Sequence, residues 1–248
     1  MNKIIELKNV TKRFGGITAL NSASLHVNKG EVVGLIGDNG AGKSTLIKTL
    51  VGVYSPDDGD IYIRGEKVVN WSSLKARISG IETVFQDRAL CPQQSIVWNI
   101  FMGKELTYPF GFIREKEQIR EANRLIREIG FTSKLIDAES PVGNLSGGER
   151  QGVAIARAIY NKAELIILDE PTTALSLNET QKVFEFVNNV KKTERSVLFI
   201  GHNIFHVFDI SDRFVILDRG EVVHQLNKDE VSSPEKLIKI MKDTVSKH

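Results

Sequence analysis

The segment Val32-Val33-Gly34-Leu35-Ile36-Gly37-Asp38-Asn39-Gly40-Ala41-Gly42-Lys43-Ser44 decides the fold. Its first five residues form an apolar run that predicts a buried strand. Its last eight residues fit the pattern G-x-x-x-x-G-K-[ST], and a helical pattern follows at Thr45–Leu50. A strand, a glycine-rich loop and a helix in this order predict a phosphate-binding loop. Glycines allow the backbone N–H groups to point inward, and the positive end of the helix attracts anions.

Two side chains at the end of this loop have predicted roles. Lys43 would reach the β- and γ-phosphates of a nucleoside triphosphate, and the Ser44 hydroxyl would complete the oxygen shell of a Mg²⁺ ion. The competing interpretation is an ordinary glycine-rich turn. The strand before the loop and the helix after it favour the phosphate site.

Other apolar runs extend this first strand into a sheet. Four of them alternate with helical patterns, at Ile81–Phe85, Leu165–Leu168, Val197–Ile200 and Phe214–Leu217. Near-continuous apolar strands are typical of a parallel sheet covered by helices on both faces, so the predicted class is α/β. Weaker alternations predict a small antiparallel sheet beside it, at Ile4–Lys8, Ala23–Val27 and Asp60–Ile63.

A helical insertion is predicted between residues 89 and 148, where no apolar strand occurs. Arg114–Glu128 carries apolar residues at helical spacing, and Gly130 follows it as a stop. Further helices are predicted at Asn178–Lys192 and after Ser233.

Polar residues follow three of the predicted strands. Asp169 and Glu170 come directly after one apolar run, and Gln86 and His202 follow two others. The carboxyl ends of parallel strands share one edge of the sheet, so these side chains are expected to converge on one crevice. We expect Asp169 to hold Mg²⁺ and Glu170 to act as general base on the attacking water. The alternatives are an acidic turn before Pro171 and ordinary loop positions for the other two residues.

A second motif, Leu145-Ser146-Gly147-Gly148-Glu149, precedes the helical pattern Arg150–Ile159. Ser146 and Glu149 have the spacing of a capping box, which is the structural explanation of the motif. That explanation leaves the paired glycines unexplained, because glycine disfavours a helix. Amides without side chains at a helix N-terminus give an anion close access, so the motif also predicts a second phosphate-binding surface.

Composition excludes several classes of protein. The 248 residues are 41% hydrophobic and 26% charged, with a formal net charge of +2, which is ordinary for a soluble domain and gives no sign of a nucleic-acid partner. Cys91 is the only cysteine, so no intramolecular disulfide can form, and we expect a small, half-buried residue there. The N-terminal residues lack the apolar stretch of a signal peptide, and no run is long enough to span a bilayer, so we expect a cytoplasmic chain.

At these motifs the sequence resembles the ATP-binding-cassette (ABC) ATPases over essentially the whole chain. Leu145–Glu149 resembles their signature, and Leu165–Glu170 their Walker B strand. The resemblance implies catalytic roles for Glu170, His202, Lys43 and Gln86, and metal-binding roles for Ser44, Gln86 and Asp169. It implies that ATP contacts Phe14 (the aromatic that stacks on adenine), Gly37, Asp38, Asn39, Gly40, Ala41, Gly42, Lys43, Ser44, Thr45, Ser146, Gly147, Gly148 and Glu149.

The resemblance also implies a fold and an assembly. The fold is a phosphate-loop NTPase with a core at 1–88 and 161–248 and a helical subdomain at 89–160. Each ATP would lie between the phosphate loop of one subunit and the signature of another, and a homodimer and a heterodimer both stay open. Many family members have aspartate at the position of Ser176, so the contact that this residue makes with the other subunit is in doubt.

Four tracts resemble ATPase subunits of importers for monosaccharides such as ribose, xylose or fructose: Ser95–Gly103, Gly201–Asn203, His206–Phe208 and Asp212–Leu217. The implied partners are permease subunits at the cytoplasmic face of the inner membrane and, indirectly, a soluble sugar-binding protein. In such importers the helical subdomain receives a permease helix, and Gln86 couples that contact to the nucleotide. The alternatives are a non-transport ABC ATPase acting on ribosomes or DNA, a small-molecule kinase, and an exporter subunit.

Overall fold

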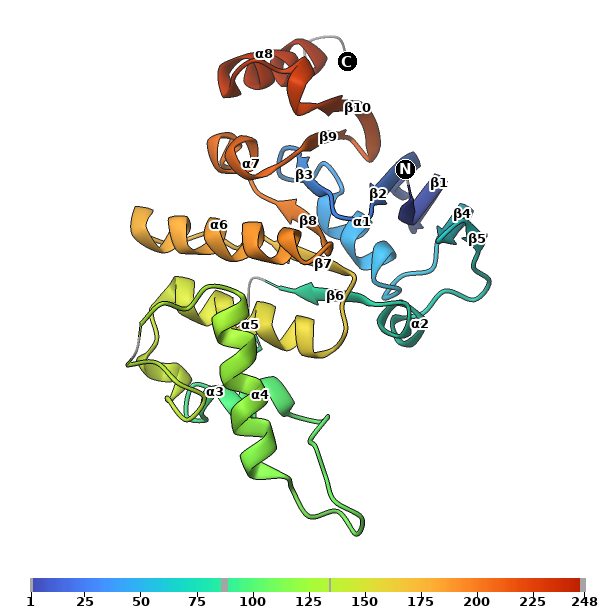
Figure 1. The fold of residues 1–248 in the computed structure, drawn as a ribbon. Helices are drawn as coiled ribbons and strands as arrows, with labels where there is room; N and C mark the ends of the chain where they lie inside the picture. Colours follow the sequence, from blue (N-terminus) through green and yellow to red (C-terminus); the bar gives the residue numbers. More distant parts are fainter. Residues whose placement is uncertain (1, 86–88, 134, 246–248) are drawn as a thin grey trace.

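A computed structural model describes residues 2–85, 89–133 and 135–245 (Figure 1). The main sheet has the strand order β10-β9-β3-β8-β7-β6. The pairs from β9 through β6 are parallel, and β10 is antiparallel to β9, which confirms the predicted mostly parallel sheet. The strands are β3 Val32–Ile36, β6 Ile81–Val84, β7 Leu165–Asp169, β8 Ser196–Ile200, β9 Arg213–Asp218 and β10 Glu221–Asn227.

A second sheet of order β2-β1-β4-β5 is antiparallel throughout, as predicted. Leu7 of β1 lies opposite Leu25 of β2 on one side and Ile61 of β4 on the other, so three predicted apolar alternations meet in one register. The strands are β1 Lys3–Phe14, β2 Ile17–Asn28, β4 Asp58–Ile63 and β5 Glu66–Lys67.

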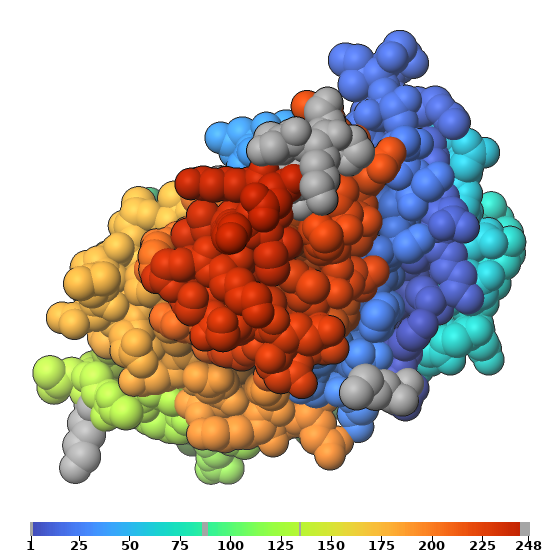
Figure 2. Space-filling view, turned by 90° about the horizontal axis from the view of Figure 1, so that it is seen from above, coloured from blue at the N-terminus to red at the C-terminus, as the bar shows by residue number. Residues whose placement is uncertain are grey.

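Helices cover the main sheet and fill the insertion between β6 and β7. They are α1 Lys43–Leu50, α2 Ser73–Ile78, α3 Ile96–Phe101, α4 Glu115–Glu128, α5 Gly147–Tyr160, α6 Leu177–Lys192, α7 Ile204–Ile210 and α8 Pro234–Val245, with 3₁₀ turns at Val142–Asn144 and Lys228–Glu230. In Figure 1, α3 and α4 lie at the opposite end of the molecule from α8. Figure 2 looks down on α8, which has the antiparallel sheet on one flank and α6 on the other.

Two hydrophobic cores lie on opposite faces of the main sheet, because side chains alternate along each strand. Val33 and Leu35 of β3 join the core beneath the antiparallel sheet and α1. Val32 and Ile36 join the core that continues into α3, α4, α5 and α6. The central strand therefore holds both layers together and fixes where the glycine-rich loop leaves the sheet.

The predicted helical insertion is present. Among the described residues between β6 and β7, α3, α4 and α5 pack together, and only isolated bridges pair as strands do. Gly130, predicted as a stop, has a φ of 108° just after α4, a conformation that favours glycine. The limits of the subdomain at 89 and 160 remain our proposal.

Candidate nucleotide-binding site

The glycine-rich loop connects β3 to α1 and approaches its neighbours closely. Gly42 precedes α1 with a φ of 103°, and a Cβ there would lie 2.6 Å from the Ala19 carbonyl oxygen. A Cβ on Gly37 would lie 2.3 Å from the Leu217 carbonyl oxygen. Neither position can take a side chain without moving backbone, so the sequence fixes the path of the loop.

Lys43 is buried at the start of α1 and points back into the loop. Its Nζ donates to the carbonyl oxygens of Gly37 at 2.6 Å and Asp38 at 2.9 Å. Burial lowers the pKa of Lys43, while the charges of Glu170, Asp38 and Asp169 act to raise it. The ammonium group is thus satisfied by neutral carbonyls, and it can exchange them for phosphate oxygens at the same place.

Asp169 and Glu170 stand at the carboxyl end of β7, next to Lys43, as predicted. Burial and the neighbouring Glu170 charge raise the pKa of Asp169, and Lys43 opposes that rise. A half-buried carboxylate of this kind gains from a nearby cation. Ser44 is exposed at the start of α1. An oxygen-only pair, one carboxylate and one hydroxyl, fits Mg²⁺, which keeps most of its ligands as water and phosphate oxygens.

Glu170 and His202 are brought together by neighbouring strands. Glu170 Oε2 lies 3.0 Å from His202 Nε2, and the Thr173 hydroxyl donates to the same oxygen at 3.3 Å. The Glu170 backbone has a φ of 52°, in the left-handed region, and its N–H donates to the Ile200 carbonyl oxygen at 3.0 Å. A non-glycine residue in this region costs about 1–3 kcal/mol, and such strain concentrates at functional sites.

A cavity of about 470 Å³ opens over the loop and contains Glu170 at its edge. Its lining residues are Ile17, Thr18, Ala19, Asn39, Gly40, Gly42, Lys43, Ser44, Thr45, Glu170 and Arg219. Sequence reasoning missed Arg219, which lies in the β9–β10 turn. The available signal was that turn, Asp218-Arg219-Gly220, directly after an apolar run.

Several of the predicted site residues are not among those that line this cavity, and Phe14 is one of them. Phe14 instead packs edge-on against Tyr54, with ring centroids 5.1 Å apart. The cavity wall is formed by the next residues of the same hairpin, Ile17 to Ala19. Gln86 lies outside the described residues, so its predicted role stays a prediction.

The second motif starts α5, with Ser146 as the N-cap. The Glu149 amide donates to Ser146 Oγ at 3.3 Å, and the Ser146 amide donates to Glu149 Oε2 at 2.9 Å, which is the predicted capping box. Neither residue lines the cavity at the phosphate loop, and neither do the two glycines between them. Within one chain, the two predicted phosphate-binding elements belong to different surfaces.

The paired glycines of this motif also have a packing reason that the sequence did not reveal. A Cβ on Gly148 would lie 2.8 Å from the Glu179 carbonyl oxygen, and a Cβ on Gly147 would lie 2.5 Å from Leu175 Cδ2. At Gly148 the N-terminal turns of α5 and α6 therefore meet too closely for a side chain, whereas at Gly147 the neighbouring atoms are ends of flexible side chains. Phosphate access is not the only explanation of the glycines.

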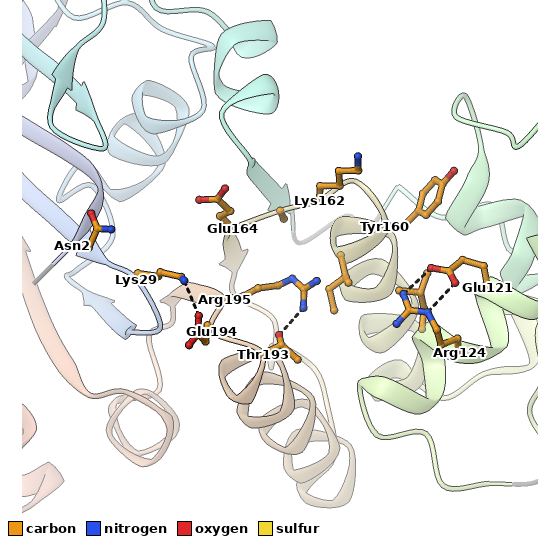
Figure 3. A pocket seen from close by; sticks show the side chains of 13 residues that line it. Asn2, Lys29, Glu121, Arg124, Tyr160, Lys162, Glu164, Thr193, Glu194 and Arg195 are labelled. Atoms are coloured by element: carbon orange, nitrogen blue, oxygen red, sulfur yellow. Dashed lines mark hydrogen bonds and ion pairs between the residues drawn. The ribbon is translucent and has the colours of Figure 1, made fainter.

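A larger hollow, of about 690 Å³, lies at the opposite edge of the sheet, before β7 and β8 (Figure 3). Some of its charged side chains pair with one another. Lys29 Nζ lies 2.7 Å from Glu194 Oε2, and Arg124 lies 2.7 Å from Glu121 Oε1 (Figure 3). The lining of this hollow contains neither the glycine-rich loop nor Glu170, so size alone does not mark the functional site.

Comparison with known proteins agrees with this geometry. The family model described as "ABC transporter" matches residues 20–173, more than half of the chain. The chain belongs to the ABC transporter family. The resemblance noted from the motifs is thereby confirmed, and so is the predicted fold.

Curated relatives of this ABC cassette include several named as import ATP-binding proteins. The xylose/arabinose import ATP-binding protein of Sulfolobus acidocaldarius is 44% identical over 95% of this chain and 92% of its own length. The fructose import ATP-binding protein of Rhizobium meliloti is 38% identical over 90% of this chain and 88% of its own length. A ribose import ATP-binding protein of Caldanaerobacter subterraneus is 36% identical over 97% of this chain, which spans 48% of that protein.

Solved structures of ABC cassettes superpose on the cassette described here. A nucleotide-free ATP-binding cassette from an ABC transporter has a TM-score of 0.80 at 25% identity, over 95% of this chain and 97% of its own. A dimeric bacterial ABC transporter cassette has a TM-score of 0.74 at 28% identity, over 90% of this chain and 98% of its own.

Proposed function

We propose that this chain is the ATP-hydrolysing subunit of an ABC importer for a monosaccharide. The relatives named for import of xylose or arabinose, of fructose and of ribose support the transported class. They differ among themselves in the named sugar, so the proposal stops at the class.

The observation that carries the ATPase proposal is the contact between Glu170 and His202 beside the phosphate loop. Glu170, held in place by His202 and Thr173, takes a proton from the attacking water as that water adds to the γ-phosphorus of ATP. The bond between the γ-phosphorus and the bridging oxygen breaks, and ADP leaves with that oxygen on its β-phosphate. Lys43 balances the charge that develops on the phosphate oxygens. Ser44 and Asp169, with Gln86 as the resemblance implies, would hold Mg²⁺, which would supply further neutralisation of the phosphate charge.

We propose that a second ATPase subunit completes each site. The cavity at the phosphate loop is open and lacks Ser146, Gly147 and Gly148, although these residues start a helix whose amides suit an anion. In a two-subunit sandwich, the partner's copy of this helix would cover the γ-phosphate. The similarity to a dimeric cassette supports this arrangement, and ATP would hold the two subunits together until hydrolysis.

We propose that the permease docks where the end of β6 leads into the helical subdomain. A groove of about 140 Å³ lies there beside α2 and β6. Its lining combines the apolar residues Val51, Val53, Ala76, Ile81 and Phe85 with Ser73, Arg77, Glu82 and Thr83. Leu74 and Ile78 of α2 are 67% and 76% exposed, and Phe85, next to Gln86, is 42% exposed. An apolar helix of a permease fits such a surface, and its position would connect docking to the nucleotide site through Gln86.

None of the described helices has both the length and the apolar character needed to cross a membrane. The relatives named as import ATP-binding proteins support a peripheral position on the cytoplasmic face of the inner membrane, through the permease, which we propose for this chain. A soluble sugar-binding protein would deliver the sugar to the other side of that permease.

The test is a strain that lacks this gene and carries a plasmid copy of the wild type, of Glu170→Gln or of Glu185→Gln. Glu185 is an exposed carboxylate on α6, away from the site, and serves as the matched control. We expect the wild type and Glu185→Gln to restore uptake of one radiolabelled sugar among xylose, arabinose, ribose and fructose, and Glu170→Gln to fail. Normal uptake of all four sugars in the strain without the gene would contradict the proposal.

A further inference from the structure

The N-terminal turns of α5 and α6 are joined by one carboxylate, that of Glu179. Its Oε1 accepts a hydrogen bond from the Gly147 amide at 2.6 Å. Its Oε2 accepts hydrogen bonds from the Ser176 amide at 3.0 Å and the Ser176 hydroxyl at 2.9 Å. Glu179 therefore closes the capping box of its own helix and, with its other oxygen, binds the first amide of the neighbouring helix.

These bonds hold the carboxylate in its charged form. The Ser176 amide and hydroxyl, followed by the Gly147 amide, lower the pKa of Glu179 to about 2. The group is ionised throughout the physiological range, so the link between the helices is a charge-assisted one at every working pH.

This contact changes which donors the signature can offer to a nucleotide. The Gly147 N–H is already bound to Glu179 Oε1, at the start of α5. The Gly148 N–H also interacts with the Glu179 carboxylate. The Ser146 hydroxyl and the Gly148 N–H would meet a γ-phosphate from the other subunit. The direction in which these two donors point depends on the orientation of the first turn of α5, and Glu179 holds that turn against α6.

We propose that Glu179 is a positioning residue for the cross-subunit half of the ATP site, aligning Ser146 and Gly148 with the loop that ends at Ser176. This inference rests on the proposed two-subunit site. Glu179 does not touch the nucleotide itself. It acts through the Gly147 amide on one side and through Ser176 on the other.

The same contact accounts for serine at position 176, where many family members carry aspartate. Ser176 Oγ lies 2.9 Å from Glu179 Oε2, so a carboxylate at position 176 would face a second carboxylate at hydrogen-bond distance. Two like charges at this separation repel, whereas a hydroxyl donates a hydrogen bond. In this chain the negative charge stands at Glu179, and Ser176 is the uncharged partner that it requires.

The test separates nucleotide binding from dimer formation in a Glu170→Gln background, in which bound ATP persists. Added to that background are Glu179→Ala, Glu179→Gln, Ser176→Asp, the double change Ser176→Asp with Glu179→Gln, and the control Glu185→Gln. A fluorescent ATP analogue measures affinity at the phosphate loop under dilute, monomeric conditions. Sedimentation velocity with Mg²⁺ and ATP measures the dimer dissociation constant.

We expect every variant to bind the nucleotide as the background does. Glu179→Ala and Ser176→Asp should weaken the dimer by about tenfold or more, the size expected when a hydrogen bond to a charged group is lost. Glu179→Gln should weaken it less, since its amide oxygen still accepts from Gly147. The double change should recover most of the affinity lost in Ser176→Asp alone, a rescue that general destabilisation would not give.

The outcomes distinguish the inference from the proposal beneath it. Parental dimer affinity in both Glu179→Ala and Ser176→Asp would overturn the positioning role. If Glu179→Ala fails to fold, equal affinity in Ser176→Asp and in the double change would overturn it as well. A background chain that forms no dimer with ATP would instead overturn the two-subunit site.

Discussion

Gly148→Ala tests whether packing or phosphate access explains the paired glycines of α5. Alanine favours a helix over glycine by up to about 1 kcal/mol, so local preference alone predicts a more stable chain. The structure predicts the opposite. The new Cβ would lie 2.8 Å from the Glu179 carbonyl oxygen and 3.2 Å from Glu179 Cα, and backbone atoms at the start of α6 cannot rotate away.

The size of the effect follows from these contacts. Overpacking costs about 1–3 kcal/mol, and a contact with backbone that cannot rotate away belongs to the upper part of that range, about 2–3 kcal/mol. Subtracting about 1 kcal/mol of helix preference leaves a net loss of about 1–2 kcal/mol. For a chain of this size, each kcal/mol lowers Tm by about 2–4 °C, so Tm should fall by about 2–8 °C.

Differential scanning calorimetry of the nucleotide-free chain measures this shift. Gly147→Ala is the matched control, because its Cβ would meet the ends of two flexible side chains, Leu175 Cδ2 at 2.5 Å and Glu179 Oε1 at 3.0 Å. We expect a smaller decrease in Tm for that variant. A Tm for Gly148→Ala equal to or above that of the wild type would refute the packing explanation and leave phosphate access as the reason for Gly148.

Three further predictions concern the site and the fold. Glu170→Gln should lower ATP turnover by about 10²–10⁴-fold, the usual contribution of a general base, while ATP affinity stays unchanged; phosphate release at the parental rate would remove Glu170 from that role. Ser146→Arg should abolish hydrolysis but leave nucleotide binding to the monomer intact, and an equal loss of monomer binding in an equilibrium titration would show that Ser146 acts within its own chain. Burial and the Arg213 charge lower the pKa of His26 below its usual 6.5, so the folded state favours neutral His26. The stabilisation that comes from keeping His26 neutral is complete above pH 6.5 and is lost as the pH falls below that value. Thermal unfolding should therefore show a smaller decrease in Tm between about pH 7.5 and about pH 5.5 for His26→Gln than for the wild type.

Periodic patterns and motifs predicted most of the fold because they depend on local sequence. The run Val32–Ile36 is buried along its whole length as β3, and the capping signals of α5 and α6 are present as hydrogen bonds. Short elements were missed. α2 spans only Ser73–Ile78, and β10 places an exposed, mostly polar strand at an edge, so neither has a strong apolar period.

The sequence predicted that Glu170 and His202 lie at one edge of the sheet, but it did not predict the contacts between separate helices. Glu170 and His202 meet because β7 and β8 are neighbours in a parallel sheet. The bond from the Gly147 amide to Glu179 depends on how two helices pack, and no spacing in the sequence encodes that packing. For the same reason the contribution of Arg219 to the cavity became visible only in the folded chain.

The most direct test of the two-subunit site is a mixing experiment with two inactive chains. Lys43→Ala removes the phosphate-loop lysine but keeps the signature, and Ser146→Arg blocks the signature but keeps the loop. A mixed dimer contains one site in which both elements are intact. If the two sites work independently, an equal mixture should recover about a quarter of wild-type ATP turnover, since about half of the dimers are mixed and each has one working site. A mixture no more active than the separate variants would contradict a site shared between two chains.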